Sequence, residues 1–541
     1  MARVIRLHRL ARRALPVVCP TPAVLGSPSR TLSKPAAAFS AAASFVPSTT
    51  TPRRNMAAAS DSEPKVSFPT ETEVSIAQDF LAFNDGSSSV FHATLEAQKR
   101  FEAAGFERLK EGQPWSLKPG GKYFLTRNQS SLVAFTIGGG FEPGNGIAVV
   151  AGHTDSPCLK VKPASKQTKE GYLTVGVQTY GGGLWHTWFD RDLSVAGRVI
   201  VKVGDTFKTR LVKINRPLLR ISNLAIHLTS AEERTAFKVN KEEHLAPILA
   251  TAAADSLNAP APAPTAAGDA GGPGAADLHH SALLGALAEE LKVSVGDIVD
   301  MELALFDVQP CALGGVYNEF VFAPRLDNLA SCFGAIEGLL KASASDEAIA
   351  AAKHVSVAAL FDHEEVGSQS GSGADGSLMA TIVSALNGDD AAAVRQSVRK
   401  SLLVSADMAH SVHPNYPGKH ERCHRPAMNA GVVIKHNVNQ RYATNLVTTH
   451  AFKQFAVAAG VKLQHFVVRQ DMGCGTTIGP ILAASLGMPT VDVGVPQLSM
   501  HSIREVCGVV DLAASTKLYE AAFKTQPDVY AALDGADEID E

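Results

Sequence analysis

The sequence predicts an α/β fold, in which a main domain with a mostly parallel central sheet is interrupted by an inserted β-rich domain. Strand-like and helix-like runs alternate from about residue 310 onward, which is typical of a parallel sheet covered by helices on both faces. Between about 160 and 309 the pattern changes to short β-like runs. A buried-strand run just before residue 160 belongs with the later strands, so the β-rich stretch divides one α/β domain in two.

Composition excludes several classes of protein. The chain has 541 residues, 45% hydrophobic and 19% charged, enough for a large core and two domains. A net charge of −3 gives no basic surface for nucleic acid, and no apolar run reaches the ~20 residues of a membrane helix. The seven cysteines include no C-x-x-C pair, which argues against a thiolate zinc site or a disulfide framework and favours reduced thiols.

The first sixty residues differ from the rest of the chain. They are rich in Arg, Ala, Ser, Thr and Pro and contain no acidic residue before Asp61. This composition predicts an organellar transit peptide over 1–60, with a disordered extension as the alternative. The initial arginines favour the mitochondrial matrix and the long hydroxyl-rich continuation favours the chloroplast stroma, which we prefer. Translation from Met56 would leave the protein in the cytosol.

The main domain begins with two amphipathic helices within 75–110, separated at Asn84-Asp85-Gly86. A hairpin follows over 122–139, with Asn128 and Gln129 at its turn. The apolar run from 146 then predicts a buried strand that leads to His153.

The remaining elements follow the same patterns. In the inserted domain we expect β-like segments at 172–180, 196–204 and 219–228, and an Ala/Pro/Gly-rich mobile surface loop at 259–280. In the second part of the main domain, strands are expected at 354–360, 401–406, 463–469 and 489–495, and helices at 328–343 and 445–460.

Polar side chains follow several of these strands. His153 and Asp155, the pair Glu364 and Glu365, Asp407, and His501 each come after a strand-like run, and Asp327 precedes a helix. Ligands of open α/β sheets collect beyond the carboxyl ends of the strands. The pattern therefore predicts a metal site in that crevice.

A charge count favours two metal ions. Asp327, Glu365 and Asp407 bring three negative charges, and two histidines, His153 and His501, are neutral ligands. Two divalent ions and one hydroxide then bring the net charge of the site to zero. Oxygen and nitrogen ligands without thiolate suit zinc, with manganese or cobalt as alternatives.

The neighbouring acids suggest catalytic roles. Asp155 is close enough in sequence to accept the second N–H of the His153 imidazole. In an extended backbone the side chains of Glu364 and Glu365 diverge, so one can bind metal while the other acts as general base on a metal-activated water.

Each residue also has a structural explanation. The Glu pair could be a solvated turn, His153 and Asp155 a structural hydrogen bond, Asp327 a helix N-cap, and His501 a satisfied loop histidine. The metal hypothesis depends on their coincidence at strand ends.

Long segments of the chain resemble one family. They are AGHTDSPCLKVKP, YGGGLWHTWFDRDLSVAGRV, FAPRLDNLASC, FDHEEVGSQS, SADMAHSVHPNY and CGTTIGPILAASLGMPTVDVGVPQLSMHSIREV. Over about 70–525 the chain is similar to the aspartyl aminopeptidases, which are cocatalytic zinc exopeptidases that remove N-terminal Asp or Glu. The resemblance implies that a metal-bound hydroxide attacks the first peptide carbonyl of peptides with acidic N-termini.

The resemblance also implies roles for individual residues. His153, Asp327 and Asp407 would bind one zinc, Asp327 would bridge to a second, and Glu365 and His501 would complete the second site. Glu364 would be the general acid/base and Asp155 would orient His153. Substrate contacts would come from Glu364, Asp407, His410 and Lys435, and from His227 across a subunit interface.

By their patterns alone, Lys435 could be an edge-strand charge and His227 a core histidine. In the resembling family, an ammonium at the end of the pocket could pair with an acidic substrate side chain.

The family fold implies a catalytic α/β domain over 61–160 and 310–541, an inserted dimerisation domain over 161–309, and a homo-oligomer, a dodecamer built from dimers. Two alternatives stay open at this point. One is a dizinc aminopeptidase of broader or neutral specificity, or an amidohydrolase, and the other is a non-catalytic self-assembling homologue.

Overall fold

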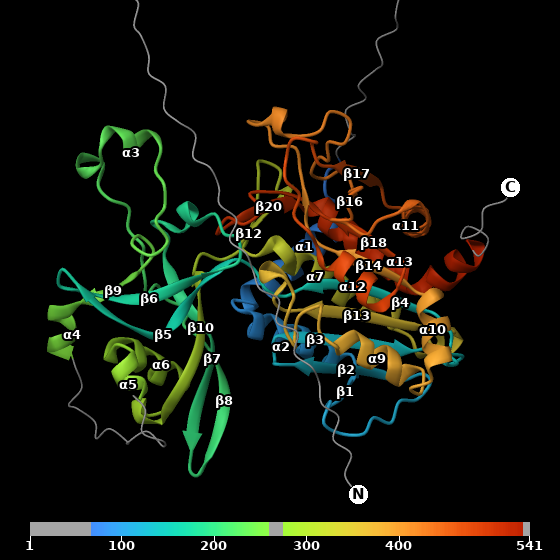
Figure 1. Ribbon diagram of the computed structural model, residues 1–541, viewed down its shortest axis with the longest axis horizontal. Coiled ribbons are helices and arrows are strands. Elements are labelled where there is room, and N and C mark those ends of the chain that lie inside the picture. The colour runs from blue at the N-terminus through green and yellow to red at the C-terminus, as the bar shows by residue number, and fades with distance from the viewer. Residues whose placement is uncertain (1–66, 259–273, 534–541) are drawn as a thin grey trace, which may run out of the picture. The chain divides into compact units, whose positions relative to one another are not determined.

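The computed structural model describes residues 67–258 and 274–533 (Figure 1). The predicted transit peptide and residues 259–273 of the predicted surface loop lie outside this part of the chain. The described residues form three sheets, of nine, six and five strands. None of the helices in the described ranges is long and apolar enough to cross a bilayer.

The nine-stranded sheet is the centre of the main domain, and five of its eight strand pairs are parallel. The predicted α/β class with a mostly parallel sheet is confirmed. In spatial order its strands are β1 (Glu107–Arg108), β2 (Lys122–Arg127), β3 (Ser131–Ile137), β13 (Val355–Phe361), β4 (Ile147–His153), β14 (Leu402–Ala406), β18 (Thr490–Gly494), β16 (Val432–His436) and β17 (Leu463–Val467).

Helices cover both faces of this sheet because its central strands are apolar on both sides. On β4, Ala148 and Val150 pack into one core while Ile147, Val149 and Ala151 pack into the other, following the period of two of a strand. One face carries α1 (Glu71–Gly86), α2 (Val90–Ala103), α7 (Leu326–Ala342), α11 (Leu446–Ala459) and α13 (Val509–Ala532). The other carries α9 (Leu378–Leu386), α10 (Ala391–Arg399) and α12 (Ile478–Leu486).

Helix ends follow local sequence signals. Thr70 and Glu73 form a capping box at the start of α1, and Asn445 caps α11 in the same way. Gly460 then ends α11 in the left-handed conformation that glycine adopts most readily. The predicted break between the first two helices is present at Gly86.

The six-stranded sheet spans 158–307 and its strands pair antiparallel. The order is β8 (Thr206–Lys213), β7 (Leu193–Val203), β10 (Ile298–Asp307), β5 (Cys158–Lys169), β6 (Tyr172–Tyr180) and β9 (Ile248–Thr251). It has its own core, to which α6 (Ser281–Leu291) contributes. The remaining short helices are α3 (Ala231–Thr235), α4 (Ala252–Asn258), α5 (Ala275–Leu278), α8 (Asp346–Ala351), η1 (Trp185–Trp188), η2 (Ile226–Leu228), η3 (Val295–Asp297), η4 (Glu364–Val366) and η5 (Pro417–Lys419).

Two expectations for this region need correction. The segment 219–228 is not a strand: it has isolated bridges at Leu219 and Arg220 and ends in the exposed turn η2, because its apolar residues find no partner strand. The end of the predicted mobile loop is ordered as well. His279 and His280 are buried there, and their rings bond the Ser165 hydroxyl and the Gln167 carbonyl.

A small five-stranded sheet was not predicted. It joins β11 (Ala312–Gly314), β12 (Phe320–Ala323), β20 (Glu505–Gly508), β19 (Pro496–Leu498) and β15 (Ala409–His410). Its strands are only two to four residues long, too short for a periodic signal. This sheet holds the segments that precede Asp327, follow Asp407 and flank His501, so it helps to position the site.

Candidate metal centre

Three of the five predicted ligands lie at the carboxyl ends of neighbouring strands of the nine-stranded sheet, and the other two come from outside that sheet. His153 is the last residue of β4, Asp407 directly follows β14, and Glu365 lies in η4 after β13, the other neighbour of β4. Asp327 is the second residue of α7, and His501 lies between β19 and β20. Gly494 on β18 allows the close approach of β14, because a Cβ there would collide with the Asp407 carbonyl oxygen.

The geometry places one carboxylate between two imidazoles. His153 Nε2 lies 3.3 Å from Asp327 Oδ1 and 3.4 Å from Asp407 Oδ1. His501 Nε2 lies 3.5 Å from Asp327 Oδ2 and 3.6 Å from Glu365 Oε1. Asp327 therefore presents one oxygen to each histidine, which is the arrangement that a carboxylate bridging two ions requires.

The donor set fits metal ions. Three buried carboxylate oxygens, Asp327 Oδ1, Asp407 Oδ1 and Glu365 Oε1, have no hydrogen-bond partner among the described residues. Buried charged oxygens without partners are costly unless a cation balances them. Two overlapping sets have ligand atoms within 4.8 Å of one another: His153, Glu364 and Asp407, and His153, Asp327 and Glu365.

Without metal ions, the pKa values of the clustered side chains also indicate that the site lacks positive charge. Burial and neighbouring carboxylates raise the pKa of Glu364 to about 8, against the effect of His153. Burial opposes protonation of His501, but Asp327 and Glu365 outweigh it and raise the pKa of the imidazole to about 10. Acids and histidines that hold protons this strongly would exchange them for metal ions.

Asp155 acts differently from the expectation. The nearest acceptor for His153 Nδ1–H is the Asp155 backbone carbonyl at 3.0 Å, whereas the Asp155 carboxylate lies 3.5 Å away. This bond leaves Nε2 free to face the cluster. The carboxylate instead accepts the backbone N–H groups of Glu364 and Glu365, each at 3.1 Å, and the Tyr180 hydroxyl at 2.6 Å.

The expectation of an extended backbone at the Glu pair is also wrong. Glu364 and Glu365 form the 3₁₀ turn η4, between His363 and Gly367 in left-handed conformations. Their side chains still separate: Glu364 Oε2 lies 3.8 Å from His153 Nε2, and Glu365 faces His501. The turn, which is hydrogen-bonded to the Asp155 carboxylate, therefore separates the two Glu side chains, as an extended strand was expected to do.

Glu505, which the sequence analysis did not identify, hydrogen-bonds to the backbone of two of the predicted ligands. Glu505 is buried, and its carboxylate accepts the backbone N–H of His501 at 2.8 Å and of Asp327 at 3.0 Å. Burial and the nearby Asp327 raise the pKa of Glu505 to about 8. Its sequence position, four residues after His501, carries no distinguishing signal.

Two of the predicted substrate residues lie beside the cluster. Lys435 is buried on β16, an interior strand, so the edge-strand explanation is wrong. Its Nζ lies 3.5 Å from Asp407 Oδ2 and 5.4 Å from the centre of the Tyr442 ring. His410 lies on β15 and is exposed in this chain, with its ring 5.5 Å from that of Phe466.

The third substrate residue does not join the cluster within this chain. His227 lies on the exposed turn η2, so it is not a core histidine. Within the described ranges, no hydrogen bond or ion pair links it to the metal ligands. Its neighbours Leu224, Ile226 and Leu228 are 57%, 64% and 72% exposed.

A carboxylate between two imidazoles, with an acid beside it at the carboxyl edge of a parallel sheet, defines a metal-dependent hydrolase of the α/β class. Residues 83–523 match the family described as aminopeptidase I zinc metalloprotease (M18). The chain belongs to this family and is a zinc aminopeptidase.

Named relatives and solved structures agree with this assignment. A probable aspartyl aminopeptidase of Ricinus communis is 48% identical over 469 residues, covering 83% of this chain and 95% of the relative. An aspartyl aminopeptidase of Caenorhabditis elegans is 47% identical over 449 residues, with the same coverage. The structure is similar to that of the Ape4 and Nbr1 complex, with a TM-score of 0.81, 40% identity and coverage of 88% of this chain and 90% of the other. It is also similar to a Saccharomyces cerevisiae mApe1 dodecamer, with a TM-score of 0.74, 31% identity and coverage of 87% and 100%.

Proposed function

We propose that this aminopeptidase uses two zinc ions to release N-terminal Asp and Glu from peptides. The observation that carries the two-ion proposal is the position of Asp327, with one carboxylate oxygen toward each histidine. His153 and Asp407 would hold one ion with Asp327, and Glu365 and His501 would hold the other with the same carboxylate. Zinc in these positions supplies a Lewis acid and a water of lowered pKa.

Glu364 handles the proton in this proposal. Of the three carboxylates that face His153 Nε2, it is the one that the ligand assignment leaves free, and the η4 turn fixes its backbone through Asp155. A carboxylate in this position can take a proton from water and deliver it to the departing amine nitrogen. The Asp155 carbonyl keeps the His153 ring in the tautomer that a metal ligand needs.

Acidic specificity is the second part of the proposal. The relatives named aspartyl aminopeptidase support it, and so does the buried ammonium of Lys435 at the edge of the cluster. In the described part of the chain its one ion-pair partner is Asp407, a proposed metal ligand, so an acidic substrate side chain could still pair with this ammonium.

We also propose a homo-oligomer. One solved relative is described as a dodecamer, and the exposed apolar side chains around His227 suit a subunit contact. In such an assembly, His227 would serve a neighbouring subunit. For the N-terminal sixty residues we propose plastid targeting, which localisation of a fluorescent fusion would test.

The proposed specificity is tested by kcat/KM for matched peptides with N-terminal Asp, Glu, Leu and Ala, using zinc-reconstituted protein that begins near Met56. We expect the two acidic substrates to be turned over at least about tenfold more efficiently, which is about 1.4 kcal/mol in transition-state binding. Equal values for Leu and Asp would instead favour an aminopeptidase of broad specificity.

A further inference from the structure

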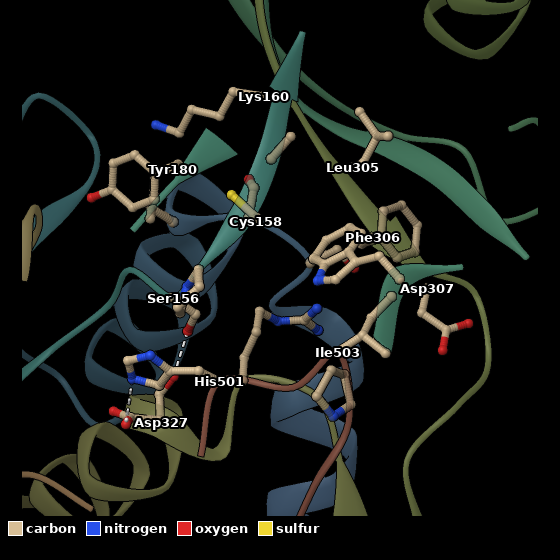
Figure 2. A pocket seen from close by; sticks show the side chains of 18 of the residues that line it. Ser156, Cys158, Lys160, Tyr180, Leu305, Phe306, Asp307, Asp327, His501 and Ile503 are labelled. Atoms are coloured by element: carbon tan, nitrogen blue, oxygen red, sulfur yellow. Dashed lines mark hydrogen bonds and ion pairs between the residues drawn. The ribbon is translucent and has the colours of Figure 1, made fainter. Parts of the chain in front are cut away.

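Residues 180–187 of the inserted domain, here called the 180–187 segment, run from the last residue of β6 into η1. Figure 2 shows Tyr180, the first residue of this segment, in the lining of the same pocket as His501 and Asp327, which form an ion pair. The segment belongs to a different sheet from the strands that carry His153 and Asp407. Its contacts concern the proposed ion position of Asp327, Glu365 and His501, here called the His501 site.

The 180–187 segment orients the ring of His501. The Nδ1–H of this histidine donates to the Gly182 carbonyl at 3.2 Å. Because a carbonyl oxygen can only accept, the bond places the ring proton on Nδ1 and leaves the lone pair of Nε2 toward Asp327 and Glu365. A histidine that binds metal commonly has its other ring N–H bonded in this way, which fixes both its tautomer and its orientation.

The same segment holds the backbone that carries this ring. His501 has a φ of +106°, which is uncommon for a residue other than glycine and persists only where the surroundings fix it. The Leu184 N–H donates to the His501 carbonyl at 2.9 Å, and the Thr187 hydroxyl accepts the Ile503 N–H at 3.0 Å. With Glu505 bonded to the His501 N–H, the backbone of this residue is held on both sides.

The beginning of the segment contacts the turn that carries Glu365. Tyr180 donates its hydroxyl to Asp155 Oδ2 at 2.6 Å, and the same oxygen accepts the Glu365 N–H at 3.1 Å. A Cβ at Gly181 would lie 3.2 Å from the Cβ of Glu365, and the φ of +72° at this position favours glycine. The segment therefore supports both ligands that belong to the His501 site alone.

The other proposed ion position, here called the Asp407 site, is supported from within the main domain. His153 Nδ1 bonds the Asp155 carbonyl, and Asp407 directly follows β14. Among the described residues, no hydrogen bond runs from the 180–187 segment to His153 or Asp407. The segment thus contacts the surroundings of the two ion positions unequally.

We propose that Tyr180, Gly182 and Thr187 are positioning residues, through which the inserted domain holds His501 and Glu365 in place for the second zinc ion. The inference rests on the proposed two-ion function and adds that the inserted domain controls how firmly one of the two ions is retained. A contact that only joined the two domains would change stability without favouring the loss of a particular ion.

Zinc occupancy measured separately at the two positions tests the inference. Crystals of zinc-loaded wild type, Thr187→Val and Tyr180→Phe are soaked in a chelator for increasing times, and anomalous difference maps at the zinc edge follow each position. We expect the His501 site to empty about tenfold faster than wild type in Tyr180→Phe and at least about threefold faster in Thr187→Val, whose hydroxyl acts through the backbone. The Asp407 site should empty at the wild-type rate.

Conservative replacements separate hydrogen bonding from packing. Thr187→Ser keeps the hydroxyl that accepts the Ile503 N–H, so it should retain zinc as wild type does, whereas Thr187→Val keeps the shape and loses the bond. Two matched controls lie elsewhere in the inserted domain and should behave as wild type. Tyr172→Phe changes the exposed first residue of β6, and Thr206→Val removes an exposed hydroxyl that bonds the Val203 carbonyl.

The outcomes distinguish this inference from the two-ion function. Zinc at both positions in wild type, with unchanged retention in Tyr180→Phe and Thr187→Val, would overturn the inference and leave the two-ion function intact. Wild-type crystals with zinc at the Asp407 site alone would remove both. Equal loss of both ions in the variants together with a lower Tm would show a general structural role and would also overturn the inference. The two variants act at opposite ends of the segment, so either one decides the question if the other does not fold.

Discussion

Glu505 and Asp327 are 178 residues apart in the sequence, and the Glu505 carboxylate accepts the backbone N–H of Asp327 at 3.0 Å. The other oxygen of the same carboxylate accepts the N–H of His501. A single buried side chain therefore sets the spacing of two proposed ligands of one zinc ion. Its position on β20 depends on the small sheet that the sequence did not reveal.

Replacing Glu505 should weaken metal retention. In Glu505→Gln, an amide NH₂ group would face a backbone N–H, so one of the two bonds is lost. We expect zinc to dissociate about 10- to 100-fold faster, the range found for residues that support metal ligands. Chelator competition with a colorimetric zinc indicator measures this rate. Glu347→Gln on the exposed surface is the matched control, and equal rates in the two variants would contradict the positioning role.

Glu364→Gln should separate metal binding from catalysis. Gln keeps the size of the side chain but cannot carry a proton, so kcat should fall by about 10²- to 10⁴-fold with two zinc ions still bound. Glu365→Gln should instead lower the zinc content, because Glu365 is a proposed ligand. Kinetics and elemental analysis of both variants make the comparison. Near-normal kcat in Glu364→Gln would remove the acid/base assignment.

Lys435→Met should change specificity. The methionine keeps most of the buried volume and removes the ammonium, so kcat/KM on Asp- and Glu-peptides should fall by about 10- to 100-fold, the equivalent of 1.5–3 kcal/mol for a charged hydrogen bond. Leu-peptides serve as the internal control because they do not use the charge. An equal loss on all substrates would show that Lys435 acts through Asp407 instead.

His227→Ala provides a test of shared sites. The residue is exposed and does not join its own cluster, so the variant should keep its zinc and its Tm while losing activity. If His227 serves a neighbouring subunit, co-assembled His227→Ala and Glu364→Gln subunits should regain activity that neither has alone. Separate affinity tags allow the mixed oligomers to be purified. Mixed oligomers as inactive as the parents would exclude the proposed sharing.

Metal removal should make stability depend on pH. In the metal-free protein the pKa values of Glu364 and His501 are raised to about 8 and about 10, so the folded state holds more protons than the unfolded chain above pH 7. The free energy of unfolding must then fall as pH rises from 7 toward 9. Asp327 has a lowered pKa and is ionised in both states over this range, so it does not oppose the trend.

Thermal unfolding of chelated and zinc-reconstituted protein at several pH values measures this difference. We expect the Tm of the zinc-loaded form to vary less over pH 7–9, because bound metal replaces the protons. A metal-free protein that is more stable at pH 9 than at pH 7 would contradict the electrostatic interpretation.

The sequence predicted the elements with a strong local signal. The apolar runs that became β4, β13, β14 and β18 were long enough to read as buried strands, and the polar residues after them were expected to meet. They do meet, because the carboxyl ends of parallel strands share one edge of the sheet. The segment 219–228 shows the limit of this approach, since apolar alternation without a partner strand left an exposed turn.

Local sequence therefore determined which segments are buried and which polar side chains follow the ends of the strands. Only the tertiary structure decided that the Asp155 carboxylate accepts the backbone N–H groups of the Glu364–Glu365 turn and that Glu505 joins two of the proposed ligands. The physical reason is that these hydrogen bonds join groups distant in the chain, whereas hydrophobic periodicity is a property of neighbouring residues.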